Sequence, residues 1–216
     1  LFCPDQCPNL TNKFGEDFER EYLKCVEKKL YKYKLPARQL WLLILDINGE
    51  SGTPYLLSKD TINRKSNYDH IGVVNISNLC SEIVQYSSPE EHAVCNLCSL
   101  ILPTFVVNKK FDFQKLIEVT KMMIINLNNI IDINFYPTKE ARFSNFRHRP
   151  IGVGIQGLAD VFMLLDLPFT SPQARQLNKH IMETIYYACF LSSVELAKEY
   201  GHYDTFKGSN FSKGLF

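Results

Sequence analysis

Apolar residues recur at helical spacing in two long segments of the chain. Between residues 113 and 131 they keep close to the roughly 3.6-residue period of an amphipathic helix, and Asp112 stands where an N-cap is expected. Ser171 followed by Pro172 has the form of an N-cap with proline at the first helical position. This pair predicts a second long helix, which ends at Gly201.

The first quarter of the chain predicts a loop followed by two more helices. Residues 1–15 are dense in Pro, Asn and Gly and are typical of an ordered loop. From Glu16 onward acidic residues precede basic ones, as the helix dipole favours, and Pro36 would end that helix. Residues 37–46 are strongly apolar and predict the next helix, before Gly52 interrupts the pattern.

The middle of the chain has the character of strands and loops. Residues 53–57 form a short β-type run, and residues 71–76 are rich in β-branched side chains. The polar stretch between them, residues 59–67, predicts a loop. Helical and β-type patterns in one chain predict the α/β fold class.

Composition excludes several classes of protein. The 216 residues are 45% hydrophobic and 22% charged, which are ordinary globular values. The 24 basic and 23 acidic residues give a net charge of +1, so nucleic acid and acidic membrane surfaces are disfavoured as partners. The longest apolar runs, residues 40–45 and 151–155, are much shorter than the roughly 20 residues of a membrane helix.

Seven cysteines, with no secretory signal at the start, favour reduced thiols and a cytoplasmic setting. Because the chain begins with Leu1 and stops at Phe216 directly after a turn signal, we expect it to be a fragment of a longer protein.

The most informative motif is the segment from Ser77 to Ile83. In an extended backbone Asn78, Cys80 and Glu82 would share one face, so an amide, a thiol and a carboxylate would line one side of a pocket. On a helix Cys80 would lie opposite Asn78. The β-branched run before the motif favours the extended form, although a buried core cysteine between solvated polar groups is the commoner arrangement.

A C-x-x-C pair follows at Cys95 and Cys98. On a helix the two thiols would share a face and could exchange as a dithiol of thioredoxin type, whereas on a strand they would point to opposite faces. A structural zinc site that combines them with Cys3 and Cys7 is a competing hypothesis.

Two further patterns are better explained by structure than by function. Gly152, Gly154 and Gly157 match the dinucleotide fingerprint formally, but Pro150 precedes them instead of a strand, so close helix packing is the better interpretation. The basic run at residues 147–149 favours structural salt bridges. The histidines, such as His92, His180 and His202, have no metal-ligand spacing.

Four segments together resemble one known family, the large subunit of class I ribonucleotide reductase of the eukaryotic type. The resemblance covers essentially the whole chain in family order and is carried by residues 1–8, 52–67, 75–106 and 146–165. It implies that residues 1–216 are part of one catalytic domain, a ten-stranded α/β barrel with long flanking helices and a central finger loop that carries a radical cysteine. The allosteric region and the redox tail of the family would lie outside this segment.

The resemblance also implies the roles of individual residues. Cys80 aligns with the thiyl radical that abstracts the 3′-hydrogen of the ribose, and Glu82 with the carboxylate that removes the 3′-hydroxyl proton. Asn78 aligns with the amide that holds the ribose hydroxyls, and Ser77 would also contact the substrate. Cys95 aligns with one of the two thiols that supply electrons, whose partner cysteine would lie upstream of this segment.

The implied activity is reduction of ribonucleoside diphosphates to deoxyribonucleoside diphosphates for DNA replication. The implied partners are a second large subunit, a small subunit whose metal cofactor supplies the radical, and thioredoxin or glutaredoxin as reductant. We expect this segment to bind no metal or cofactor itself, ATP and dNTP effectors to bind elsewhere, and the segment alone to be inactive.

The sequence departs from the family at Cys98, where the family usually has a small residue without a thiol. Cys98 would be either an inert packing residue or an alternative exchange partner for Cys95. A non-catalytic domain held together by zinc is the remaining alternative.

Overall fold

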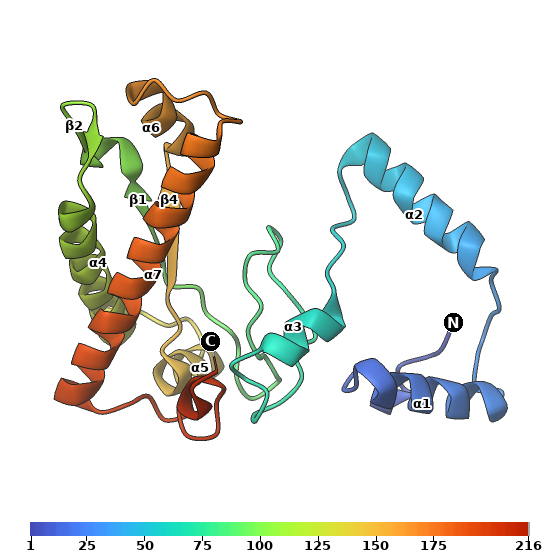
Figure 1. Ribbon diagram of the computed structural model, residues 1–216. Coiled ribbons are helices and arrows are strands. Elements are labelled where there is room, and N and C mark those ends of the chain that lie inside the picture. The colour runs from blue at the N-terminus through green and yellow to red at the C-terminus, as the bar shows by residue number, and fades with distance from the viewer. Residues whose placement is uncertain (216) are drawn as a thin grey trace. The chain divides into compact units, whose positions relative to one another are not determined.

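The computed structural model describes residues 1–215, which form two compact units (Figure 1). The first unit contains residues 1–90 and the segment that begins at Lys207, and the second contains residues 91–206. The strands within residues 1–215 form two 2-stranded sheets. The predicted mixture of helices and strands is therefore confirmed, whereas the described residues alone do not close a barrel.

Two long helices dominate the second unit and pack against each other: α4 (Phe113–Ile133) and α7 (Pro172–Tyr200) (Figure 1). The side chain of Asp112 caps α4 by accepting from the Lys115 N–H at 2.9 Å. The hydroxyl of Ser171 caps α7 by accepting from the Ala174 N–H at 3.1 Å. Both predicted helices and both predicted N-caps are confirmed.

The paired strands of this unit are β1 (Leu97–Ile101) and β4 (Gly152–Gln156), which run parallel. A parallel pair needs a long connection, and here it includes the helices α4 and α5 (Lys139–His148). The connection also contains a small antiparallel hairpin, β2 (Val106–Val107) with β3 (Lys110–Phe111).

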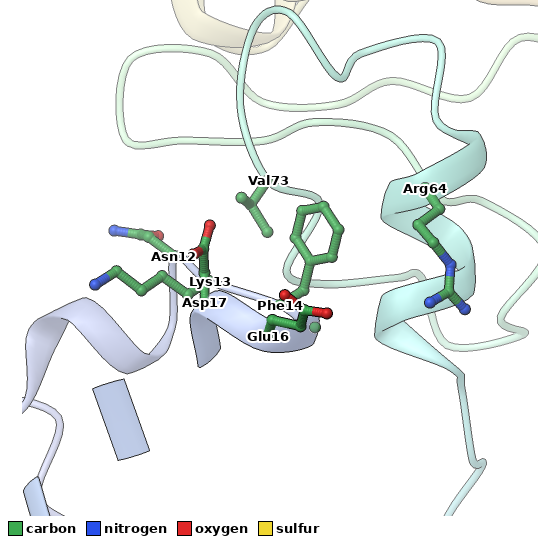
Figure 2. Close-up of a pocket in the computed structure, with 8 residues that line it drawn as sticks. Asn12, Lys13, Phe14, Glu16, Asp17, Arg64 and Val73 are labelled. Atoms are coloured by element: carbon green, nitrogen blue, oxygen red, sulfur yellow. The ribbon is translucent and has the colours of Figure 1, made fainter. Parts of the chain in front are cut away.

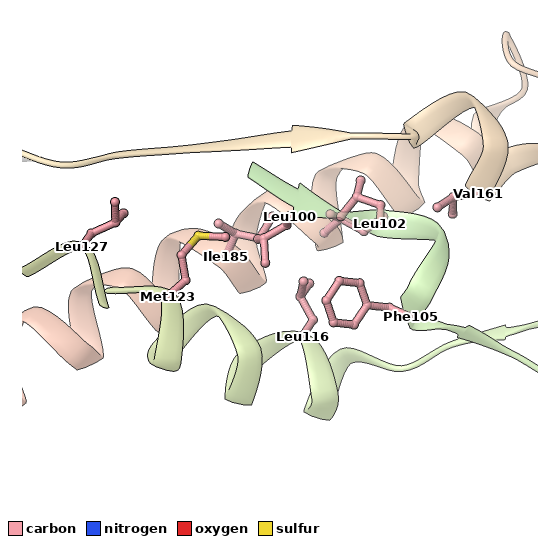
Figure 3. Packing of buried hydrophobic residues seen from close by; sticks show 9 residues of the cluster. Leu100, Leu102, Phe105, Leu116, Met123, Leu127, Val161 and Ile185 are labelled. Atoms are coloured by element: carbon pink, nitrogen blue, oxygen red, sulfur yellow. The ribbon is translucent and has the colours of Figure 1, made fainter. Parts of the chain in front are cut away.

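A hydrophobic core fills the space between β1, α4 and α7 (Figure 3). Its members come from five elements, including the short helices η2 (Leu102–Phe105) and α6 (Leu158–Leu164). The buried residues of the cluster are Leu100, Leu102, Phe105, Leu116, Met123, Leu127, Val161, Ile181 and Ile185. This packing fixes β1 against the two long helices.

The glycine pattern at residues 152–157 serves close approach, as predicted, but mainly between strands. A Cβ atom on Gly154 would lie 2.9 Å from the Ser99 hydroxyl on the neighbouring strand β1. Gly157 has φ 79° at the start of α6, and a Cβ there would lie 2.6 Å from the Pro103 ring. The expected helix packing is therefore corrected for Gly154, which packs strand against strand.

The first unit begins with an irregular segment that contains η1 (Pro8–Leu10), followed by α1 (Gly15–Glu27) and α2 (Ala37–Ser51). The first helix ends well before Pro36, because Lys29 adopts a left-handed φ of 58°. The second helix is five residues longer than predicted, from 46 to 51, and ends at Gly52, which has φ 74°.

Residues 53–67 differ from both predictions made for them. No strand forms at residues 53–57, and the polar stretch contains the helix α3 (Lys59–Lys65) instead of a loop. Asp60 lies in the first turn of α3, and Arg64 and Lys65 lie in the last, an arrangement that the helix dipole favours. That charge order was the signal in the sequence that the loop interpretation overlooked.

The strand predicted at residues 71–76 is also absent. At Val74 a side chain takes the place of a neighbouring strand. The Val74 N–H donates to Asn63 Oδ1 at 2.7 Å, and Asn63 Nδ2 donates to the Val74 carbonyl at 3.0 Å. The backbone N–H and carbonyl of Val74 thus find their hydrogen-bond partner in an amide side chain on α3. No local pattern in residues 71–76 reveals this partner.

The helix α2 exposes an unusually apolar surface. Leu40, Trp41, Leu42 and Leu43 are all exposed, and no residue of this helix is buried. No helix within residues 1–215 is long and apolar enough to cross a membrane.

The core packing leads to a stability prediction for two isoleucines near the end of α4. Ile131 is fully buried, whereas Ile133 is 82% exposed. We expect Ile131→Ala to lower the free energy of unfolding by about 2–5 kcal/mol, because it removes buried methyl groups and leaves a cavity. Ile133→Ala should change it by less than about 0.5 kcal/mol. Urea unfolding of the two variants measures this difference, and equal effects would contradict the packing.

Candidate active site

The segment that carries Cys80 is a turn, not a strand. The Ser81 N–H donates to the Asn78 carbonyl at 3.0 Å, and Ser81 has a left-handed φ of 67°. Leu79 and Cys80 occupy the two central positions of this turn and are exposed. The prediction of an extended backbone with alternate side chains on one face is therefore wrong.

The side chain of Asn78 is the reason that the chain turns here. Its Oδ1 accepts from the Ile83 N–H at 3.0 Å and from the Ser77 hydroxyl at 3.4 Å. An asparagine that bonds to a nearby backbone N–H stabilises a turn in preference to a strand. Within residues 1–215, Asn78 Nδ2 donates to no acceptor, so the amide keeps two N–H groups for a ligand.

This loop carries a thiol, a carboxylate, an amide and a hydroxyl group within six residues. Cys80 and Glu82 are both exposed, and Ser77 and Asn78 are half-buried at its base. The loop thus presents a thiol and a carboxylate beside an amide that is already anchored through its oxygen. A thiol and a carboxylate two residues apart can act on neighbouring atoms of one small substrate.

The C-x-x-C pair belongs to the second unit and lies at the beginning of β1. Cys98 is on β1, in register with Val153 of β4, and Cys95 lies two residues before that strand. Both side chains are exposed. The expectation of a redox thiol on a strand is thus corrected for Cys95, and the helical dithiol required by the thioredoxin alternative is absent.

A buried pair of amides fixes the backbone between these two thiols. Asn96 Nδ2 donates to Asn145 Oδ1 at 2.7 Å and to the Pro150 carbonyl at 2.8 Å, and Asn145 Nδ2 donates back to Asn96 Oδ1 at 3.3 Å. The Asn96 carbonyl accepts from the Gly152 N–H at 2.8 Å, where β4 begins. Sequence reasoning missed this pair, because a single asparagine in an apolar run gives little signal.

The basic run at residues 147–149 is structural, as predicted. Glu91 is buried and binds both Arg147 and His148 Nε2 at 2.8 Å. Arg149 reaches Asp132 on α4 at 2.8 Å, and this hydrogen bond holds the pKa of Asp132 below its usual range. Each basic side chain thus has an acidic partner within its own unit.

The four cysteines of the zinc alternative lie in different units: Cys3 and Cys7 in the first, and Cys95 and Cys98 in the second. No three His, Cys, Asp or Glu side chains among residues 1–215 are grouped so that they could hold a metal ion. Cys7 is buried, and its burial, together with a hydrogen bond between its thiol and Cys25, raises the pKa of that thiol. A raised pKa makes this thiol a poorer metal ligand and nucleophile than an exposed one.

A hollow of about 470 Å³ lies in the first unit beside the start of α1 (Figure 2). Figure 2 shows Phe14 and Val73 on one side of it and Arg64 of α3 opposite. None of the predicted site residues lines it; the lining residues are Asn12, Lys13, Phe14, Gly15, Glu16, Asp17, Arg64 and Val73.

Known proteins resemble this chain throughout its length. A family model described as the barrel domain of ribonucleotide reductase matches residues 1–216. The chain is 53% identical over 216 residues to a protein of Danio rerio named ribonucleoside-diphosphate reductase large subunit, covering 100% of this chain and 27% of that protein. Proteins with the same name from Variola virus and Arabidopsis thaliana are 52% and 49% identical over 215 and 235 residues. These matches cover 100% of this chain, and the chain spans only 28% and 29% of those two relatives.

The amide pair beside Cys95 gives a prediction of its own. Asn145→Ala would remove both hydrogen bonds that Asn145 exchanges with the buried amide of Asn96 and would leave only the bond to the Pro150 carbonyl, so we expect the free energy of unfolding to fall by about 1–3 kcal/mol. Asn129→Ala, at an exposed position of α4, is the matched control and should have little effect. Denaturant midpoints measure both, and a control that loses as much stability would contradict a specific role of the pair.

Proposed function

The chain belongs to the ribonucleotide reductase barrel-domain family, and on that premise we propose that it forms part of an enzyme that reduces ribonucleoside diphosphates. The reaction consumes a ribonucleoside diphosphate and a dithiol and yields the 2′-deoxyribonucleoside diphosphate, a disulfide and water. The observation that carries the proposal is the hydrogen-bonded turn that exposes Cys80 beside Asn78 and Glu82.

Cys80 acts first in the proposed mechanism. As a thiyl radical, its sulfur takes the 3′-hydrogen atom of the ribose and leaves a carbon radical on the sugar. Two central positions of a tight turn project their side chains away from the chain, so the sulfur of Cys80 can reach a sugar without approach of the backbone. The hydrogen atom returns from Cys80 to the sugar at the end of the cycle, and the thiyl radical forms again.

Glu82 and Asn78 handle the hydroxyl groups in this mechanism. The Glu82 carboxylate accepts the 3′-hydroxyl proton as a general base. The two free N–H groups of Asn78 donate to ribose oxygens, while its Oδ1 remains bound to the Ile83 N–H. Ser77, which bonds to the same Oδ1, contacts the substrate from the base of the loop.

Cys95 supplies one of the two electrons and hydrogens that the ribose gains, and it ends as a disulfide with a cysteine outside this segment. Thiol exchange with thioredoxin or glutaredoxin reduces that disulfide again. The exposure of Cys95, two residues before β1, supports this role, because exchange requires in-line access of another sulfur.

The remaining components are proposed from the family. A small subunit with a metal cofactor generates the radical, and two large subunits associate. The two strands β1 and β4 would belong to a single ten-stranded barrel domain, in a cytoplasmic enzyme whose ATP and dNTP effectors bind elsewhere. Residues 1–216 alone would be inactive, because in this proposal the second redox cysteine and the radical route lie outside this segment.

Replacement of the radical thiol tests the proposal most directly. In the full-length enzyme with its small subunit, we expect Cys80→Ser to reduce turnover by at least about 10³-fold, because a serine hydroxyl does not form the corresponding radical. Binding of a ribonucleoside diphosphate, measured by equilibrium dialysis, should be retained. Substantial turnover in this variant would rule out the proposed mechanism.

Cys98 provides the matched control, since it is also an exposed thiol in a different position. We expect Cys98→Ala to keep kcat within about twofold of the unmodified enzyme, because the thiol makes no contact that the mechanism uses. Steady-state assays with a thioredoxin system measure this. A large loss would show that Cys98 exchanges electrons with Cys95.

A further inference from the structure

The buried side chain of Asn63 holds the arm of the chain that leads into the Cys80 loop. Its Oδ1 accepts from the Val74 N–H at 2.7 Å, and its Nδ2 donates to the carbonyls of Val74 and Lys59 at 3.0 Å each. A residue of an antiparallel strand exchanges the same two hydrogen bonds with its partner. Asn63, on α3, therefore gives Val74 the pairing that a neighbouring strand would give it.

A second contact closes the base of the loop. A Cβ atom on Gly72 would collide with Cε2 of Tyr86, so the ring of Tyr86 packs directly on the backbone of Gly72. Gly72 lies on the incoming arm and Tyr86 on the outgoing arm. The two arms are thus fixed by Asn63 and by this ring, and the turn with Cys80 lies between them.

No strand ladder stabilises the loop itself. Between Asn75 and Gln85 the described chain forms no strand, and the hydrogen bonds across the loop are those of the turn and of Asn78. The position of Cys80 therefore depends on how firmly the base is held. A displacement of about 1 Å at a reacting atom can cost on the order of 100-fold in rate.

We propose that Asn63 is a positioning residue that fixes the base of the Cys80 loop and so sets the place of the sulfur relative to the ribose. The inference rests on the proposed function, because it assigns Asn63 a role in the same reaction. Asn63 acts through Val74 and does not itself touch the substrate.

The experiment uses the full-length enzyme with its small subunit and compares Asn63→Asp and Asn63→Ala with Asn75→Ala. Asp is nearly isosteric with Asn and keeps an acceptor for the Val74 N–H, but in its ionised form it has no donor for the Val74 carbonyl. Asn75 is the matched control, because it is exposed in the same loop arm and, among residues 1–215, its amide donates only to Asn12, at 3.2 Å.

We expect both Asn63 variants to lower kcat by about 10- to 100-fold while KM for the ribonucleoside diphosphate changes by less than about threefold. Amide hydrogen exchange should increase in peptides covering residues 74–86 and stay unchanged in α4, which has its own core. Asn75→Ala should leave both kcat and the exchange pattern nearly unaltered.

Three results would overturn the inference: an unchanged kcat in folded Asn63→Asp, an equal loss in Asn75→Ala, or a loss of kcat that merely follows the unfolded fraction. If neither Asn63 variant folds, Gly72→Ala displaces Tyr86 from the same base and should lower kcat in the same way. An unchanged kcat in that variant would also overturn it.

Cys80→Ser separates this inference from the proposed function. If Cys80→Ser is inactive and Asn63→Asp is fully active, only the positioning role is wrong. If Cys80→Ser itself turns over, the proposed function fails and the positioning role fails with it.

Discussion

The segments that carry the candidate site depend on asparagine side chains that satisfy the backbone where no strand does. Nearly all buried backbone N–H and carbonyl groups have a hydrogen-bond partner, and an irregular segment lacks the repeating pattern by which a helix or a sheet provides one. Asn63 serves Val74 in this way, and Asn78 serves Ile83. In the second unit the Asn96 amide serves the carbonyl of Pro150, just before β4. The amide group suits this task, because it carries both a donor and an acceptor.

This dependence explains which predictions from the sequence succeed. The helices α4 and α7 are stabilised by hydrogen bonds between residues close in sequence, so the signals that predict them are also close in sequence. These signals are the period of apolar residues, the capping Asp112 and the Ser171-Pro172 pair. The outcome at residues 71–76 is different, because a β-branched run indicates only that the chain is extended and does not identify its partner. That partner is Asn63, eleven residues earlier on a helix that the sequence pattern did not predict.

The candidate site shows the same limit more sharply. Its residue types follow from the sequence, and the family resemblance proposes what each does. Their arrangement does not follow, because the turn depends on two hydrogen bonds, from the Ser81 N–H to the Asn78 carbonyl and from the Ile83 N–H to Asn78 Oδ1, that no pattern of residue types indicates. The preceding β-branched residues favour a strand, but a short polar side chain competes effectively with a ladder that has no second strand.

The turn also suits the proposed radical chemistry better than a strand would. On a strand, the thiol, the amide and the carboxylate would share one face, and that face would have to be open to admit a sugar to all three. On the turn, the thiol projects at the tip while Asn78 is fixed at the base through its oxygen, so the groups can contact different sides of one ribose. A reactive sulfur at an exposed tip, next to a Leu79 that is 86% exposed, needs a protein surface around it to exclude water and oxygen. The relatives are more than three times as long as this chain, so in them the remaining length can supply that surface.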